Sequence, residues 1–145
     1  MLISPEIATA IEGAIRNAEL GTSGEIRVHI DDRCNEDILD RAAFLFSELE
    51  MHKTELRNGV LILVTTDDRK MAILGDGGIH IKVGQDFWDD AKTAMITHFK
   101  NENWKDGLCE GVRLVGEKLK MHFPIAVNDT NELSNTITFG KNTHK

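Results

Sequence analysis

Two apolar runs separated by a short polar segment constrain the fold of this chain more than any other feature. Val60–Val64 is apolar without a break, which is typical of a strand covered on both faces. Met71–Leu74 follows after the polar residues Asp67–Lys70. A parallel crossover needs a dozen or more residues, so the two runs must form an antiparallel hairpin. A strand buried on both faces also requires helices on both sides of its sheet.

The rest of the pattern supplies those helices and a further strand. Alternating Ile26, Val28 and Ile30 predict a strand over residues 25–30, parallel to 60–64 because a helical segment connects the two. Gly75–Gly78 is predicted as a loop. We therefore expect an α/β fold, a three-layer α/β/α sandwich with a mixed sheet of about four strands and flanking helices. The predicted helices cover residues 5–20, 35–52, 86–99 and 103–122.

The chain divides into a patterned part and a polar tail. A length of 145 residues suits one domain, and residues 1–124 carry all the strong helix and strand patterns. Residues 125–145 are polar and weakly patterned. The apolar stretch Ile137–Phe139 in this tail either adds a short edge strand or belongs to a partly disordered segment.

Charge and composition exclude several classes of function. The formal net charge of −7 and a pI of about 5.3 disfavour nucleic acid and anionic lipid as partners, because phosphates would be repelled. A mildly acidic surface is also the commonest way to stay soluble. No apolar run reaches the length of a membrane span and the N-terminus lacks a basic leader, so we expect no membrane insertion and a cytoplasmic location. Cys34 and Cys109 are too far apart in sequence for a thiolate zinc motif and are predicted to be free thiols.

Several short motifs, in this order and spacing, resemble a known family. They are Ser23–Val28, Arg57–Leu61, Ile73–Asp76, Phe87–Trp88 and Gly107–Leu108, followed by His122–Pro124 and Asn131–Asn135. Together they look like the TPM domain, over about residues 5 to 124, in a stand-alone bacterial form. That family includes a thylakoid-lumen acid phosphatase, a photosystem II repair factor and a nematode modulator of acetylcholine receptors.

The resemblance implies an α/β/α sandwich that holds divalent cations, calcium especially, on acidic positions. It implies phosphatase activity only for some members. One departure concerns the segment before the last helix, where the family often has Gly-Asp-Tyr and this chain has Glu102-Asn103-Trp104. An amide in place of the acid weakens any ligand role at that position.

The predicted topology gathers carboxylates at both ends of the sheet. Asp31, Asp32, Asp67 and Asp68 follow the ends of the two parallel strands, where open α/β sheets usually bind ligands. The opposite end gathers a second set of polar residues: Ser23, Glu25, Arg57, Asn58 and Asp76. Calcium takes six to eight oxygen ligands and magnesium keeps more water, so either cluster offers suitable atoms.

Each cluster also has a structural interpretation. Asp31, Asp32, Asp67 and Asp68 could serve turns and caps, where Asp is favoured whatever the function. Arg57 could satisfy Glu25 and Asp76 as an ion pair, with Asn58 as a left-handed turn residue. Alternatively, Arg57 beside a cation would bind a phosphate dianion.

Other catalytic arrangements find no support. The histidines form no metal-binding pair and no triad at recognisable spacing, and the chain shows no dedicated nucleophile. His29 falls on the polar face of its strand and is predicted to lie at the surface. Gly75–Gly78 is followed by no Lys-Ser or Lys-Thr, so nucleotide binding is disfavoured.

Two functions from different classes follow. The favoured one is a binding module: a calcium-binding domain, with magnesium possible, that docks on a protein partner or assists an assembly. The alternative is a metal-dependent acid phosphatase acting on phosphate monoesters, with Arg57 and the cation holding the phosphate while a carboxylate activates water. The oligomeric state is left open by the sequence.

Overall fold

A computed structural model describes residues 3–125 and 137–140, and one mixed sheet lies at its centre. In these residues the strand order is β3-β2-β1-β4. β1 and β2 pair in parallel, from Glu25 opposite Gly59 to Asp31 opposite Thr65. β2 and β3 pair antiparallel, so the predicted hairpin is confirmed. The strands are β1 Glu25–Asp31, β2 Gly59–Thr65, β3 Lys70–Gly75 and β4 Thr138–Phe139.

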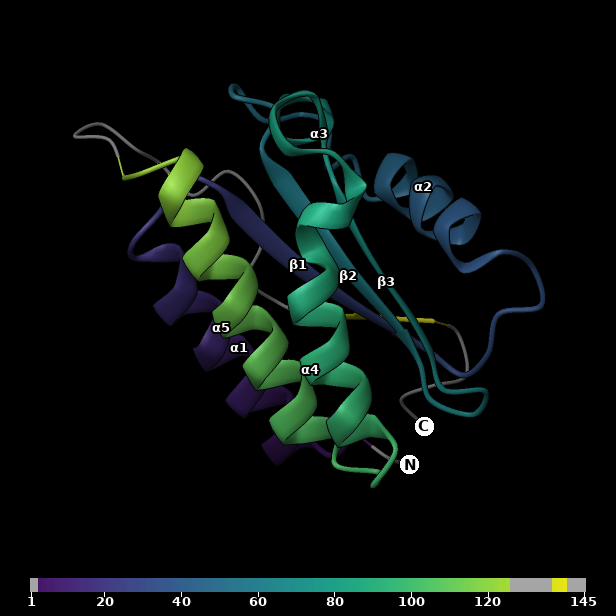
Figure 1. Cartoon of the computed structure of the whole chain (residues 1–145). Helices are drawn as coiled ribbons and strands as arrows, with labels where there is room; N and C mark the ends of the chain where they lie inside the picture. The colour runs from purple at the N-terminus through teal and green to yellow at the C-terminus, as the bar shows by residue number, and fades with distance from the viewer. Residues whose placement is uncertain (1–2, 126–136, 141–145) are drawn as a thin grey trace.

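Helices cover both faces of this sheet, as a fully buried β2 requires (Figure 1). α1, α4 and α5 form one layer, and α2 lies on the opposite face. The predicted α/β/α sandwich is therefore confirmed. The helical segments are α1 Pro5–Glu19, α2 Ile38–Glu48, α3 Gly77–Val83, the 3-10 turn η1 Gln85–Trp88, α4 Asp89–Phe99 and α5 Trp104–His122.

Alternation along the strands divides the core into two clusters. On the three-helix side, Ile26, Val28 and Ile30 of β1 pack with apolar residues of α1, α4 and α5. On the α2 side, Leu61 and Leu63 of β2 pack with the buried residues of that helix. The larger cluster contains the apolar side chains of β1, and the smaller one contains none. The side chains on the opposite face of β1 are therefore polar.

The segment after β3 corrects one prediction. Gly77 and Gly78 do not belong to a loop but begin α3 directly after the strand. Asp76 caps this helix, because its carboxylate accepts a hydrogen bond from the Gly77 N–H at 2.7 Å. A Cβ built on Gly78 would lie 2.5 Å from the carbonyl oxygens of Leu56 and Arg57. Glycine is needed here for a close backbone approach inside a helix, and the sequence pattern alone suggested an irregular turn.

The structure also corrects three smaller predictions about helix bounds and turn residues. The second helix is shorter than residues 35–52, because Asp37 caps it and it ends at Glu48. The aromatic helix is interrupted, with η1 preceding α4. The left-handed residue before β2 is Arg57, at φ 52°, and not Asn58.

The tail contributes one short element to the described residues. β4 pairs in parallel with His29 and Ile30 at the edge of the sheet, so the edge-strand alternative holds for residues 138–139. The Asn131–Asn135 part of the family resemblance lies outside the described residues. Among the helices of the described ranges, none has the length and apolar character that a membrane crossing requires.

The close approach at Gly78 gives a test of the fold with a matched control. Gly78→Ala is expected to lower the free energy of unfolding by about 1–3 kcal/mol, since the new methyl group meets two backbone carbonyls. Gly77→Ala, one residue earlier, meets only the end of the Arg57 side chain at 3.8 Å and should change stability by less than about 0.5 kcal/mol. Urea unfolding of both variants checks this, and equal stabilities would contradict the packing of α3.

Candidate functional site

The carboxyl ends of β1 and β2 form an open hollow. Two backbone hydrogen bonds continue the pairing beyond the strands, from Thr66 N–H to the Asp31 carbonyl at 3.0 Å and from Asp67 N–H to the Asp32 carbonyl at 2.7 Å. They bring Asp31, Asp32 and Asp67 to one place, as the topology predicted. The hollow has a volume of about 570 Å³ and is lined by His29, Asp31, Asp32, Arg33, Arg41, Leu45, Asp67, Phe139 and Gly140.

Ion pairs in this hollow are loose. Arg33 Nη2 lies 3.6 Å from Asp67 Oδ2, and Arg41 Nη2 lies 3.6 Å from Asp31 Oδ2. The side chains of Arg33 and Asp67 are 63% and 49% exposed, so their attraction is weakened by solvent. A ligand that interacts more strongly with these carboxylates can replace the ion pairs with little loss of free energy. Asp31 and Asp67 are therefore only weakly paired with these guanidinium groups, and Asp32 lines the same hollow.

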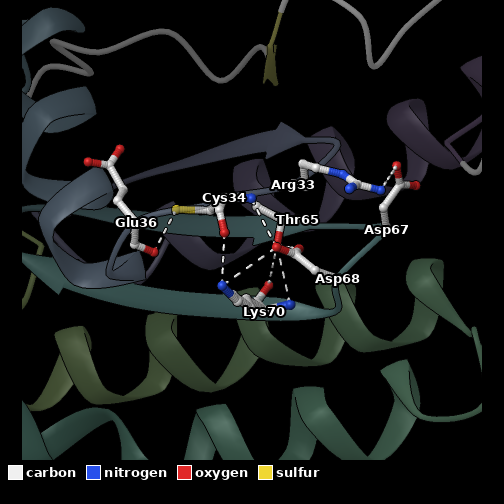
Figure 2. A network of polar contacts seen from close by, with 7 residues as sticks. All are labelled: Arg33, Cys34, Glu36, Thr65, Asp67, Asp68 and Lys70. Carbon is white, nitrogen blue, oxygen red and sulfur yellow. Dashed lines mark hydrogen bonds and ion pairs between the residues drawn. The ribbon is translucent and has the colours of Figure 1, made fainter.

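Asp68 differs from its neighbours because its carboxylate is held by several groups (Figure 2). It accepts hydrogen bonds from the Thr65 hydroxyl and, at 3.0 Å, from the Cys34 N–H. Lys70 Nζ lies 3.7 Å away and also donates to the Cys34 carbonyl at 2.8 Å. Burial pushes the pKa of Asp68 upward, but the hydrogen bonds and the Lys70 charge outweigh it, and the pKa is lowered. Asp68 thus connects the β2–β3 turn to the segment after β1 through hydrogen bonds.

His29 is a residue that the sequence analysis placed wrongly. It was expected at the surface, yet it is only 5% exposed. Its Nδ1 lies 2.8 Å from the Thr138 hydroxyl of β4, and its Nε2 lies 3.6 Å from Asp31 Oδ2. Burial lowers the pKa of His29 despite the nearby Asp31 charge. Strand alternation predicted the face correctly but not the pairing with β4, which brings the Thr138 hydroxyl against the imidazole.

At the opposite end of the sheet, the predicted cluster forms a closed ion pair. Arg57 Nε and Nη2 each donate to a different oxygen of Asp76 at 2.7 Å. Asp76 is 5% exposed and also caps α3. Hydrogen bonds to Asp76 raise the pKa of Arg57 further. Asn58 donates to the Ser23 hydroxyl at 3.4 Å, and Glu25 is buried beside them at the start of β1.

The six predicted cation ligands therefore do not form one site. Asp31, Asp32 and Asp67 share the hollow, Asp68 is engaged in the turn, and Glu25 and Asp76 lie at the other end of the sheet. Within residues 3–125 and 137–140, no group of three or more His, Cys, Asp or Glu side chains is already arranged to hold a metal ion. Binding at the hollow would require side-chain movement.

Comparison with known proteins decides the family. The model of the TPM domain matches residues 1–118. This chain belongs to the TPM-domain family. Among curated proteins no match is found. The matched residues include β1, β2 and β3 and the helices from α1 to α4, and they end within α5.

Solved structures agree with the assignment. The BA42 protein of the psychrophilic bacterium Bizionia argentinensis is 44% identical, with a TM-score of 0.88 and 95% of each chain covered. Two bacterial N-terminal domains share the fold of this TPM domain. One, from P. gingivalis, is 21% identical with a TM-score of 0.68, over 84% of this chain and 79% of the other. The second, of the cg2496 protein from Corynebacterium glutamicum, is 13% identical with a TM-score of 0.63, over 99% of this chain and 84% of that one.

The contacts of Asp68 predict a pH-dependent stability. Because folding lowers this pKa, the stabilisation is fully present above about pH 4, where the carboxyl of the unfolded chain is also ionised. It is lost as the pH falls through the lower pKa of the folded state. Asp68→Asn should lower the free energy of unfolding by about 1 kcal/mol at pH 7, and the difference should shrink as the pH falls below 4.

Urea unfolding between pH 7 and pH 2 measures this difference. Asp67→Asn is the matched control, since it removes the adjacent carboxylate, which forms an exposed ion pair with Arg33. It should change stability by less than about 0.5 kcal/mol at neutral pH. A deficit in Asp68→Asn that stayed constant with pH would contradict the role given to the charge of Asp68.

Proposed function

We propose that this TPM domain binds a divalent cation in the hollow at the carboxyl ends of β1 and β2, with Ca²⁺ as the first candidate and Mg²⁺ as the second. The observation that carries the proposal is the meeting of Asp31, Asp32 and Asp67 around one open space. Asp31 and Asp67 each lie 3.6 Å from a guanidinium nitrogen, whereas Asp76 at the other end is bound at 2.7 Å by two guanidinium nitrogens. The hollow therefore leaves its carboxylates freer to bind a cation than the Arg57–Asp76 end does.

The donor set suits a hard cation. Calcium accepts carboxylate and backbone oxygens in a flexible arrangement at 2.3 to 2.6 Å, and loops after strands supply such oxygens. Binding requires the ion pairs of Asp31 and Asp67 to open and Arg33 to move outward. Arg33 has the freedom to do so, because its side chain is 63% exposed. The cation would replace two weak ion pairs and connect the ends of two adjacent strands.

A protein-docking role is the second part of the proposal. Five large apolar side chains are exposed on segments near the end of the sheet opposite the hollow: Leu20, Leu56, Ile81, Met121 and Ile125. The segments of Leu20 and Ile125 meet at the Thr22–Pro124 bridge, and α3 meets the end of α5 through Lys82 Nζ, 4.6 Å from the Phe123 ring centre. The Leu56 segment meets α3 where the Gly78 N–H donates to the Arg57 carbonyl at 2.9 Å. Exposed apolar side chains that are gathered on adjoining segments are typical of protein-binding surfaces. We propose that the cation stabilises the domain while the opposite end meets a partner.

Calcium should stabilise the folded domain. At a concentration 100 times its dissociation constant, a ligand bound only to the folded state adds about 2.7 kcal/mol. The midpoint of thermal unfolding should therefore rise with Ca²⁺ and return on addition of a chelator. Asp31→Asn and Asp67→Asn should each remove most of this rise.

Asp90→Asn provides the control for net charge. Asp90 is 88% exposed on α4, where its oxygen lies 3.7 Å from Lys118 Nζ, far from the hollow. This variant should keep the full calcium response. At matched ionic strength, a midpoint that Ca²⁺ does not move would contradict the cation proposal, and an equal loss in all three variants would argue for a general charge effect.

The metal-dependent acid phosphatase alternative has one observation in its favour. Arg33 and Arg41 line the same hollow as Asp31, Asp32 and Asp67, so a guanidinium would lie close to a bound cation. Arg57, the residue predicted to bind phosphate, lies at the other end of the sheet with both Nε and Nη2 donating to Asp76. If the phosphatase function applies, Arg33 and Arg41 are better placed than Arg57 to act beside a cation in the hollow.

Hydrolysis of a generic phosphate monoester should be weak or absent. The chain carries a net charge of −7, which repels anionic substrates, and it shows no nucleophile motif. Release of p-nitrophenol from its phosphate ester with and without Ca²⁺ or Mg²⁺ measures the activity. Robust metal-dependent turnover that Arg41→Gln lowers, with cation affinity retained, would favour the phosphatase over the binding module.

A further inference from the structure

His29 points to a second class of cation for the hollow, an inference that rests on the cation site proposed above. We propose that His29 Nε2 and Asp31 are ligands for a first-row transition ion of the Zn²⁺ class. His29 is 5% exposed, and its buried Nε2 has no hydrogen-bond partner among residues 3–125 and 137–140. A buried, unsatisfied ring nitrogen is costly unless something binds it.

The contacts of Thr138 allow the tautomer of His29 that a metal ligand needs. The Thr138 hydroxyl lies 3.5 Å from the Val28 carbonyl, and between these two oxygens only the hydroxyl can donate. The hydroxyl oxygen is then the acceptor for His29 Nδ1–H at 2.8 Å. In this arrangement Nε2 carries the lone pair, which is the form of His29 that a metal ion bound at Nε2 would select. β4 thus orients the imidazole in the way that hydrogen bonds to the second ring nitrogen orient histidine ligands in metal sites.

Two acceptors then face each other at the inner wall of the hollow. His29 Nε2 and Asp31 Oδ2 are 3.6 Å apart, and neither can donate to the other when the imidazole proton is on Nδ1. A metal ion bound by both atoms at about 2.0–2.2 Å would satisfy them together. Asp32 and Asp67 line the same hollow and supply further oxygens.

Guanidinium groups surround this site, since Arg33 and Arg41 line the hollow and the Arg27 charge also acts on His29. Arg41 Nη2 is 3.6 Å from the same Asp31 oxygen, so a bound ion must displace or face this guanidinium. Arg41 is one-third exposed and can withdraw toward solvent. The backbone of Gly140 leaves room for Asp31, because a Cβ built on Gly140 would overlap the Asp31 carboxylate. The C-terminal segment therefore positions both proposed ligands, His29 through Thr138 and Asp31 through Gly140.

The imidazole nitrogen changes which ion the hollow prefers. Calcium takes oxygen ligands, whereas zinc and its neighbours bind imidazole well and follow a fixed order of affinity for nitrogen and oxygen sites. The oxygens of Asp31 and Asp67 serve both kinds of ion, but only a transition ion gains from His29. We expect Zn²⁺ to bind at least tenfold more tightly than Ca²⁺.

Isothermal titration of the full chain with ZnCl₂ and separately with CaCl₂ tests the proposal. His29→Asn is the informative variant, because Asn carries an amide nitrogen near the place of Nδ1 and can keep the contact with Thr138 while Nε2 is lost. It should bind Zn²⁺ at least tenfold more weakly and Ca²⁺ within about twofold of wild type. His80→Asn, on exposed α3 at the other end of the sheet, should bind both ions as wild type does.

The outcomes separate this inference from the calcium proposal. Unchanged zinc affinity in His29→Asn, or equal loss in His80→Asn, would overturn the assignment of His29 while leaving calcium binding intact. Zinc binding that depends on His29 in a chain that does not bind Ca²⁺ would support the inference and contradict calcium as the cation. If His29→Asn unfolds, the ¹⁵N shift of His29 Nε2 in wild type decides: a large shift with Zn²⁺ supports ligation, and no shift overturns it.

Discussion

The burial of β2 on both faces is the constraint on which the rest of the structure depends. All seven residues of this strand are buried, so helices must cover both sides of the sheet. β1 lies parallel on one side of β2 and β3 antiparallel on the other. This arrangement brings the ends of β1 and β2 together and places the end of β3 beside their beginnings. Both clusters of charged residues follow from this topology.

The two ends of the sheet use carboxylates in different ways. At the amino end, Asp76 is buried and accepts two 2.7 Å hydrogen bonds from Arg57, which fixes α3 to the segment before β2. At the carboxyl end, Asp31 and Asp67 face an open hollow with cationic groups at 3.6 Å. A carboxylate bound in the first way contributes to the fold, and one held in the second way has capacity left for a ligand. This difference supports placing a cation at the carboxyl end.

Sequence patterns predicted the sheet and its ends because periodicity and connection lengths depend on local chemistry. The hairpin, the parallel pair and the meeting of Asp31 with Asp67 all follow from strand lengths and topology. His29 was misplaced because its burial depends on Thr138, which is 109 residues away in sequence. α3 was missed because Gly78 is there for a contact with Leu56 and Arg57 that no local pattern reveals.

Mapping of backbone amide shifts during a Ca²⁺ titration tests the central claim most directly. The ¹H–¹⁵N signals of Asp31, Asp32 and Asp67 should move together and saturably, with neighbouring Arg33 shifting as its ion pair is replaced. Signals of Gly77 and Gly78, next to the Arg57–Asp76 pair, should stay in place. Shifts confined to the Arg57–Asp76 end, or small shifts spread over all exposed carboxylates, would contradict a cation site at the carboxyl ends of β1 and β2.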